Sequence, residues 1–251
     1  MKPTIYDVAK EAQVSIATVS KVINDTGRIS EKTRKRVLEA MEKLRYQPSV
    51  VASALTGKRT NTLGLLIPDL ANPFFAEVAR HVEDRGQEKG FNVIMCSTDY
   101  NPANIRWSSK ERIRGYREAL EAAEIGFDED LVFISNSTIE AGKRVAGELL
   151  DAGPHPTAIF ALNDVLAIGT IKAVRERGLK IPEDIAIVGF DDTILATIVD
   201  PPLTTVAQPI RDMGYQAMDL LIEKIEGQEN TTKRIILSPQ LMIRQTTCPL
   251  T

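Results

Sequence analysis

The chain has 251 residues, of which 43% are hydrophobic and 26% are charged, so it is long enough to bury a core and has an ordinary globular composition. Its two cysteines, Cys96 and Cys248, lie far apart, which excludes a disulfide-rich secreted scaffold. No apolar signal core follows Met1 and no apolar run approaches the length of a membrane span, so we expect a cytoplasmic protein without membrane contact.

Charge is distributed unevenly along the chain. Residues 1–60 carry 12 lysines and arginines against 6 aspartates and glutamates, a net charge of +6. The other 191 residues carry 19 against 28, a net charge of −9, which together give the −3 of the whole chain. A basic segment attached to an acidic body is typical of a protein whose first part binds a polyanion such as DNA.

The basic part begins with two short helical patterns. Thr4 and Asp7 have the spacing of a capping box, and apolar residues follow at helical spacing as far as Ala12. Only two residues, 13 and 14, separate this pattern from Ser15, whose hydroxyl suits the N-cap of a second helix. Two helices joined by so short a turn predict a helix-turn-helix motif.

A third helix is predicted from Ser30 to Tyr46, where the following Gln47-Pro48 stops it. We expect this helix to turn Val37, Leu38, Met41 and Leu44 inward, and Lys32, Arg34, Lys35 and Arg36 outward.

The second helix has the two faces that a DNA-reading helix needs. Val19, Val22 and Ile23 recur at helical spacing and predict the face that packs against the other helices. The opposite side, near the start of the helix, carries Ile16, Ala17, Ser20 and Lys21. Short or hydrogen-bonding side chains in these positions can reach base edges in the major groove. A three-helix bundle that binds no DNA is the alternative, and the basic charge of this part argues against it.

Residues 5–9, 14–24 and 30–48 closely resemble the DNA-binding head of the LacI/GalR family of bacterial repressors, and the resemblance continues through 49–57. It implies a helix-turn-helix domain over 1–48, a hinge helix and linker over 49–61, and an effector-binding and dimerisation core over 62–251. It also implies that Leu55 is the apolar wedge by which the hinge helix opens the central minor groove.

The resemblance assigns roles within the head. Ile16 and Ala17 match the two base-reading positions that open the recognition helix, and Lys21 matches the third. Apolar side chains can touch thymine methyl groups, and a lysine can donate to guanine. Contacts that fix the register on phosphates are expected from Lys2, Thr4, Ser15, Thr18, Ser20 and Asn24.

The rest of the chain alternates strand and helix patterns. We expect strands over 63–67, 91–95, 158–161 and 185–189 and helices over 74–89 and 164–177, with the first strand buried on both faces. This alternation predicts an α/β fold with parallel sheets. Residues 67–75, 112–116, 156–164, 188–192 and 202–206 resemble the periplasmic-binding-protein-like core of the same family, in which two α/β lobes surround a ligand cleft.

The core is shorter than the resemblance implies. After Asn104 the chain passes directly to the helix of Arg112, so part of the core, about 80–90 residues or roughly three βα units, is missing between about 104 and 108. Two interpretations stay open. Either the two half-lobes merge into one sheet, or the chain is an internal-deletion product with a damaged core.

The resemblance also implies an effector site. The family's cleft positions are Arg112, Asn163 and Asp191, with Asp69 and Phe75 on the side of the first lobe. Carboxylate and amide oxygens, a guanidinium and an aromatic ring suit a polyol, so we expect a sugar or a sugar phosphate. Asn163 and Asp191 can equally serve as a helix cap and a turn former at strand ends.

We expect no metal and no cofactor, because His81, His155 and the two cysteines have no ligand spacing, and no catalytic constellation is visible. The hypothesis is a non-enzymatic repressor that binds a palindromic DNA operator as a homodimer and responds to a small effector. A DNA-binding internal-deletion remnant without effector response is the alternative. A soluble sugar-binding protein or a small α/β enzyme is a second alternative, with little in the sequence to support it.

Overall fold

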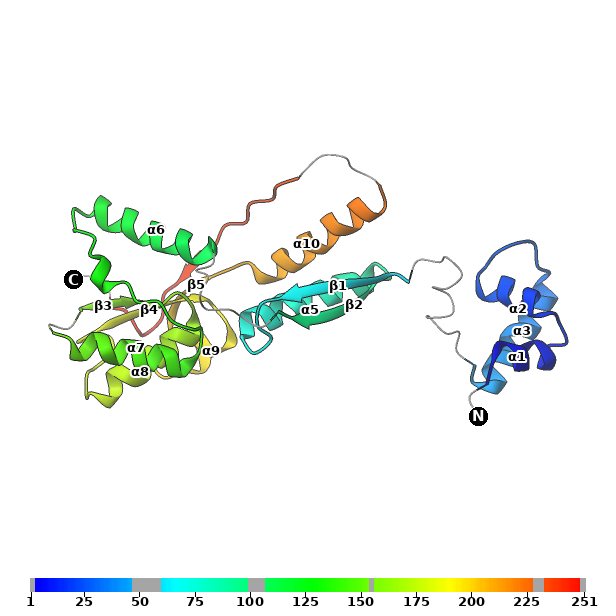
Figure 1. Ribbon diagram of the computed structural model, residues 1–251, viewed down its shortest axis with the longest axis horizontal. Coiled ribbons are helices and arrows are strands. Elements are labelled where there is room, and N and C mark those ends of the chain that lie inside the picture. The colour runs from blue at the N-terminus through cyan, green and yellow to red at the C-terminus, as the bar shows by residue number, and fades with distance from the viewer. Residues whose placement is uncertain (1–2, 47–59, 99–106, 154–155, 228–232, 249–251) are drawn as a thin grey trace. The chain divides into compact units, whose positions relative to one another are not determined.

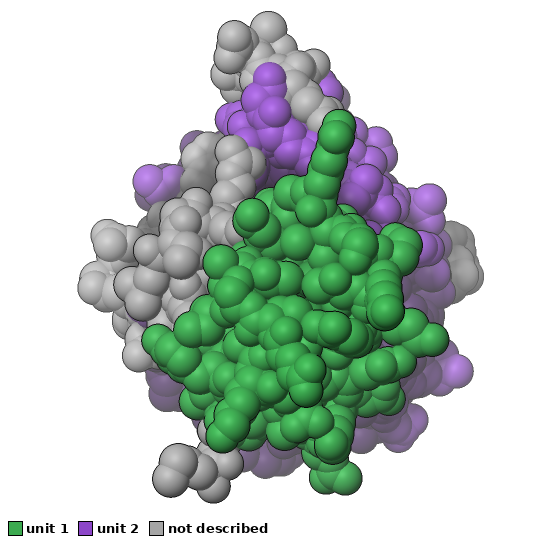
Figure 2. Space-filling view, turned by 90° about the vertical axis from the view of Figure 1, so that its right-hand side faces the viewer, with its two compact units in different colours: residues 1–62 green, residues 63–251 purple. Residues whose placement is uncertain are grey.

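A computed structural model describes residues 3–46, 60–98, 107–153, 156–227 and 233–248 of the chain. The chain divides into two compact units, residues 1–62 and 63–251, which are coloured separately in Figure 2. Unit 1 consists of helices, and unit 2 contains both helices and strands (Figure 1).

Unit 1 has the three predicted helices, α1 (Ile5–Glu11), α2 (Ile16–Ile23) and α3 (Glu31–Leu44). The side chain of Ser15 accepts a hydrogen bond from the backbone of Thr18 at 3.1 Å, as predicted for an N-cap. Ser30 starts α3 in the same way, and Thr4 and Asp7 form the predicted capping box. The buried residues of the unit come from all three helices: Val8, Ala9, Ala12, Val19, Val22, Val37 and Ala40.

The predicted inner face of α3 is wrong at one position. Leu38 is 50% exposed, whereas Ala40, two residues later, is buried. The inner stripe runs through Val37, Ala40, Met41 and Leu44, which have the i, i+3, i+4 and i+7 spacing of one helix face. Leu38 follows Val37 directly and lies about 100° around the helix from it, outside the edge of that stripe.

Unit 2 contains the remaining elements. In chain order they are β1 (Thr62–Ile67), α5 (Pro73–Glu88), β2 (Asn92–Ser97), α6 (Trp107–Ala122), the short 3-10 helix η1 (Glu129–Leu131), α7 (Ile139–Asp151), β3 (Ala158–Phe160), α8 (Asp164–Glu176), β4 (Ala186–Asp191), α9 (Ile194–Ile198), β5 (Thr204–Ala207), α10 (Ile210–Ile225) and β6 (Gln240–Met242).

These strands form two sheets. One has the order β3-β4-β5-β6, in which β3, β4 and β5 are parallel and β6 is antiparallel to β5. The other consists of β1 and β2, and the amide of Thr98 just after β2 donates to the carbonyl of Ile67 at 3.0 Å. The α/β class and the parallel pairing are confirmed. The half-lobes do not merge into one sheet among the described residues, so that interpretation is wrong.

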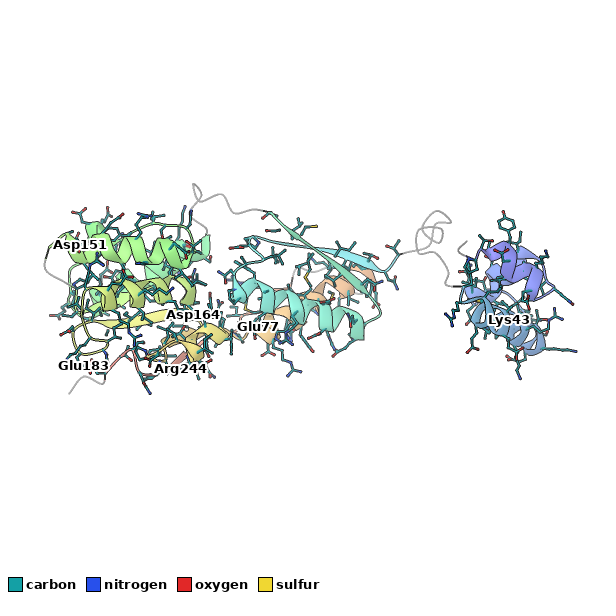
Figure 3. All side chains as sticks on the ribbon, turned by 90° about the horizontal axis from the view of Figure 1, so that it is seen from below. Lys43, Glu77, Asp151, Asp164, Glu183 and Arg244 are labelled. Atoms are coloured by element: carbon teal, nitrogen blue, oxygen red, sulfur yellow. The ribbon has the colours of Figure 1, made fainter. Side chains whose placement is uncertain are left out.

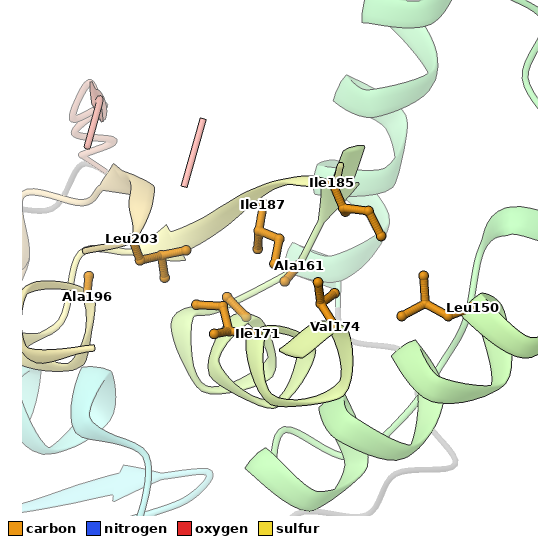
Figure 4. Packing of buried hydrophobic residues seen from close by; sticks show 9 residues of the cluster. Leu150, Ala161, Ile171, Val174, Ile185, Ile187, Ala196 and Leu203 are labelled. Atoms are coloured by element: carbon orange, nitrogen blue, oxygen red, sulfur yellow. The ribbon is translucent and has the colours of Figure 1, made fainter. Parts of the chain in front are cut away.

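The larger core lies between the four-stranded sheet and helices α7 and α8. Ile171 and Val174 of α8 face Ala161 and Ile187 of the sheet region, and Leu150 of α7 packs beside them (Figure 4). The two helices approach each other closely because both carry glycine at the crossing. A Cβ atom on Gly169 would lie 2.2 Å from the carbonyl oxygen of Ile139.

The smaller sheet is covered on one face only. Val82, Met218 and Ile222 of α5 and α10 pack against the inward side chains of β1 and β2. On the other face Leu66 is 70% exposed, so the prediction that this strand is buried on both faces is wrong. A continuous apolar run is typical of a strand between two layers, and in this chain the second layer is absent from the described residues.

Candidate functional site

Helix α2 presents the predicted recognition residues to solvent. Val19 and Val22 are buried against α1 and α3, which seats the helix. Ile16 is 41% exposed, and Ala17 and Lys21 are also exposed. The helix therefore offers two apolar side chains in its first turn and one ammonium group in its last turn to solvent.

The turn between α1 and α2 is held by a side chain whose role the sequence did not indicate. Gln13 adopts a left-handed backbone conformation with φ of 53°, which makes the two-residue turn possible. The Arg36 guanidinium of α3 donates to the carbonyl of Ala12 at 2.8 Å and to that of Gln13 at 3.3 Å. Arg36 is exposed, as expected for a residue of the basic face, and its guanidinium also holds the corner of the motif.

Ion pairs tie the helices of unit 1 together. Lys43 of α3 lies 2.6 Å from the carboxylate of Glu11 on α1, and Lys43 is labelled on this unit in Figure 3. Arg34 pairs with Asp25, which follows α2. Exposed pairs of this kind contribute little stability each, but they orient the helix ends.

The expected phosphate contacts lie at both ends of α2 and at the start of α1. The Thr4 hydroxyl donates to Asp7 at 2.7 Å, and the hydrogen bonds from Thr4 lower the pKa of the Asp7 carboxyl. Ser15 and Thr18 share a hydrogen bond of 2.9 Å. Asn24 donates to Ser20 at 3.1 Å. These hydroxyl and amide groups are thus held by local hydrogen bonds, whereas Lys2 and Leu55 lie outside the described residues.

Unit 2 contains a cavity of about 660 Å³. Four of the five predicted effector residues line it: Phe75 of α5, Arg112 of α6, Asn163 before α8, and Asp191 at the end of β4. Asp69 is not part of the lining. Its carboxylate accepts a hydrogen bond from the backbone of Ala71 at 2.8 Å and so forms a turn before α5.

Arg112 joins the elements of the cavity. Its guanidinium lies 3.5 Å from the Asp191 carboxylate and donates to the carbonyl of Leu162. The same guanidinium lies over the ring of Phe190, 3.8 Å from the ring centre. A planar cation between a carboxylate, a carbonyl and an aromatic face is held in one orientation.

Asp191 is the most perturbed group of the site. The residue is buried, its φ of 111° is far from the strand region, and its carboxylate accepts a hydrogen bond from Gln208 at 2.6 Å. Burial raises its pKa to about 7, although Arg112 and Gln208 act in the opposite direction. Gln208, which also lines the cavity, has no motif around it and was missed in the sequence.

Asn163 has the cap role that was weighed against a ligand role. Its side-chain oxygen accepts a hydrogen bond from the backbone of Leu166 at 2.9 Å and caps α8. Asn72 does the same for α5, accepting from Phe74 at 3.0 Å, and it also lines the cavity. Two helix starts therefore open at this cavity.

Next to the cavity, Asp164 forms a buried hydrogen-bonded cluster, and it is labelled in Figure 3. Its carboxylate accepts from the backbone and hydroxyl of Thr193 at 2.7 and 3.0 Å, and from the Thr205 hydroxyl at 2.6 Å. Burial raises its pKa. This carboxylate links the start of α8 to the strands, so its role is structural.

In the described part of the chain, no group of three histidine, cysteine or acidic side chains could hold a metal ion. The same residues contain no helix that is long and apolar enough to cross a bilayer.

Comparison with known proteins identifies both parts of the chain. Residues 4–49 match the model of bacterial regulatory proteins of the lacI family, and residues 84–247 match the periplasmic binding protein-like domain. The chain is 38% identical to the HTH-type transcriptional regulator DegA of Bacillus subtilis, with 100% of the chain and 99% of DegA covered. It is 32% identical to the ribose operon repressor of Halalkalibacterium halodurans, with 97% of each covered.

Solved structures agree with this result. The CelR–cellobiose complex matches with a TM-score of 0.68 and a sequence identity of 26%. The match covers 97% of this chain and 99% of the CelR chain. The Lac repressor dimer bound to operator has a TM-score of 0.85 at 23% identity, with 99% of this chain and all of that chain covered, which shows the shared fold.

The alignment with DegA runs over 336 residues, 85 more than the 251 of this chain, so at least that many positions of the relative have no counterpart here. Even so, the matches extend from the helices of unit 1 to β6 of unit 2. The chain belongs to the LacI family of bacterial regulatory proteins and is a DNA-binding transcriptional regulator.

Proposed function

We propose that this regulator is a repressor that binds a palindromic operator as a homodimer through α2. The main support for this proposal is the exposed part of α2. Ile16 and Ala17 in its first turn and Lys21 in its last turn lie outside the core that buries Val19 and Val22. Apolar contact with thymine and donation to guanine are the readout that these side chains can make. Ser15 and Thr18 at the helix start are proposed to fix the register on phosphates, as are Thr4, Ser20 and Asn24.

A homodimer is proposed because two-fold operators need two heads. The Lac repressor of similar fold has been solved as a dimer on its operator. In unit 2, Ile194 and Ile198 of α9 are 64% and 68% exposed, one turn apart on one side of the helix. Exposed apolar pairs of this kind are typical of a surface that a partner covers.

A small neutral polyol is the proposed effector, bound by Arg112, Asn163, Asp191 and Phe75 with the help of Gln208. Sugars are bound by relatives: CelR has been solved with cellobiose, and a LacI-family regulator of Enterococcus faecium with ribose. The charge of Arg112 is opposed by Asp191, which favours an uncharged sugar over a sugar phosphate. Asp69 is left out of this proposal because it does not line the cavity.

The second candidate is a regulator that binds DNA without responding to an effector. The observation that favours it is the missing stretch of at least 85 positions, because an allosteric core has two lobes that move together. Both candidates act in the cytoplasm and without catalysis, in accordance with the relatives, which are transcriptional regulators.

The two candidates differ in one titration. Operator DNA enriched from a random library by the wild-type chain is labelled, and its binding is followed by fluorescence anisotropy with and without a panel of sugars that includes cellobiose and ribose. The first candidate predicts that one sugar shifts the midpoint at least tenfold. Arg112→Ala is expected to lose that shift and to keep the affinity measured without sugar.

Arg117→Ala is the matched control, because Arg117 lies on the same helix but stacks on Phe127, outside the cavity, at 4.2 Å. It is expected to keep the sugar response. If no sugar moves the midpoint of the wild type, the effector proposal fails and the second candidate stands.

A further inference from the structure

One edge of the larger sheet ends without a neighbour. The strand order begins at β3, and the backbone groups of residues 157 and 161 bond to β4, as in the hydrogen bond from Ala161 to the carbonyl of Val188 at 2.8 Å. Because bonding directions alternate along a strand, the backbone groups of Ala158 and Phe160 point away from β4. No described strand pairs with them.

The chain also carries an apolar segment that belongs to none of the described sheets. Residues 132–135, Val-Phe-Ile-Ser, follow η1, and Val132 has extended dihedral angles. Ile134 is 62% exposed and Phe133 is exposed as well. We call residues 132–135 the donor segment.

The donor segment and β3 line the same cavity without being paired. A four-residue strand with its side chains fills roughly 600 Å³ at the usual spacings of strands and sheets, which is close to the size of the cavity. The only charged side chains in the lining are Arg112 and Asp191, and they face each other. The cavity therefore has the size and the balance of charge that suit one added strand.

The donor segment does not pair with its own β3. Four residues after it, α7 begins at Ile139, where a Cβ on Gly169 of α8 would lie 2.2 Å from the carbonyl oxygen of Ile139. This close contact holds the start of α7 on α8. Among the described residues, no strand supplies the neighbour that β3 lacks.

We propose that a second copy of this chain supplies it. The donor segment of the partner adds to the free edge of β3, and the donor segment of the first copy does the same to the partner. Around a two-fold axis the resulting order is β3, the partner's donor segment, the first copy's donor segment and the partner's β3. One exchange therefore fills both cavities, and the exchanged dimer excludes a bound sugar. An exposed edge strand favours such pairing. The proposal goes beyond the operator-bound dimer, because it uses a different surface from α9.

Two variants test the two sides of the contact. Ala158→Pro removes an amide that points away from β4, and proline at an edge strand leaves the β3–β4 ladder intact. Ala158→Thr keeps the amide and is the matched control. Ile134→Glu places a charge on the donor segment at an exposed position, so folding is not at risk there. Circular dichroism verifies that each variant is folded.

Sedimentation velocity without DNA, from nanomolar to micromolar concentration, gives the result. We expect Ala158→Pro and Ile134→Glu each to weaken one association step at least tenfold relative to the wild type and to Ala158→Thr. Mixing the two variants restores one of the two contacts, since one chain has an intact donor segment and the other an intact edge. The mixture is therefore expected to associate more strongly than either variant alone.

Equal association of the wild type and both variants would overturn the proposal, as would a mixture no stronger than its components. If Ala158→Pro alone fails to fold, the association of Ile134→Glu, alone and mixed with the wild type, still tests the proposal. DNA is absent from the test, so its outcome is separate from that of the proposed operator binding.

Discussion

At the scale of single residues, Lys21 carries the clearest prediction. Lys21→Ala removes the ammonium group that α2 exposes to solvent in its last turn, and it should cost about 1–3 kcal/mol of operator binding free energy. The loss should be confined to operators that keep one particular base pair, because a base-reading contact is specific. Binding curves for the operator and for its single-base variants measure this.

Lys32→Ala serves as the control, since Lys32 is an exposed lysine on α3 rather than on the recognition helix. It should lower affinity equally for all operators, if at all. A uniform loss for Lys21→Ala as well would make Lys21 a phosphate contact and contradict its proposed role.

Asp191 makes stability depend on pH. Its pKa is raised from 3.8 to about 7 in the folded protein, so between these values the folded state binds the proton more tightly than the unfolded state does. The free energy of unfolding should therefore fall as the pH rises, by about 2 kcal/mol between about pH 5 and about pH 8, and then level off.

Urea unfolding at several pH values measures this fall. Asp191→Asn cannot ionise, so its stability should fall less over the same range, with the remaining slope coming from groups such as Asp164, whose pKa is also raised. An equal fall in the variant and the wild type would show that Asp191 does not carry the effect.

The residues of the cavity show what a sequence can reveal. Arg112, Asn163 and Asp191 lie in segments that resemble known family segments, and they do line one cavity. Asp69 lies in such a segment too, but its carboxylate is used in a turn. Gln208 could not be found from sequence, because only the fold brings a residue 17 positions beyond Asp191 to that carboxylate.

At the scale of elements, the crossing of α7 and α8 is the most sensitive packing contact. Gly169→Ala would place a Cβ 2.2 Å from the carbonyl oxygen of Ile139 and 2.6 Å from the amide of Lys143. The helices would have to separate, and we expect a loss of about 1–3 kcal/mol in the stability of unit 2. Thermal unfolding followed by circular dichroism measures it.

Gly115→Ala is the matched control in α6, where a new Cβ would meet nothing within 4 Å. Alanine is the better helix former, so this variant should be unchanged or stabilised by up to about 1 kcal/mol. Equal destabilisation by both substitutions would mean that the crossing is not the cause.

Helices were easier to predict than sheets. The helix starts at Ser15 and Ser30 depend on local hydrogen bonds, which capping residues reveal in the sequence. The burial of β1 and the antiparallel addition of β6 depend on which segments become neighbours, and no local pattern encodes that. Leu38 was misplaced because a single position lies close to the border of a helix face.

At the scale of the whole molecule, the chain combines a basic unit with an acidic one. Residues 1–60 carry a net charge of +6 and the other residues a net charge of −9. The first part therefore attracts the DNA phosphates, and the second part repels them. In the described part of the shortened core, β1 and β2 are covered on one face, and one edge of β3 has no neighbouring strand. A sequence can indicate that part of the core is missing, but it does not indicate which of the remaining strands pair with one another.

Helix α2 is proposed to read a two-fold symmetric DNA sequence. Repeated selection of double-stranded DNA from a random library by the wild-type chain, followed by sequencing, is the decisive measurement. We expect enrichment of two inverted half-sites, the arrangement that two identical DNA-binding units require. Enrichment of sequences without inverted symmetry, or recovery of all sequences to the same degree, would contradict it.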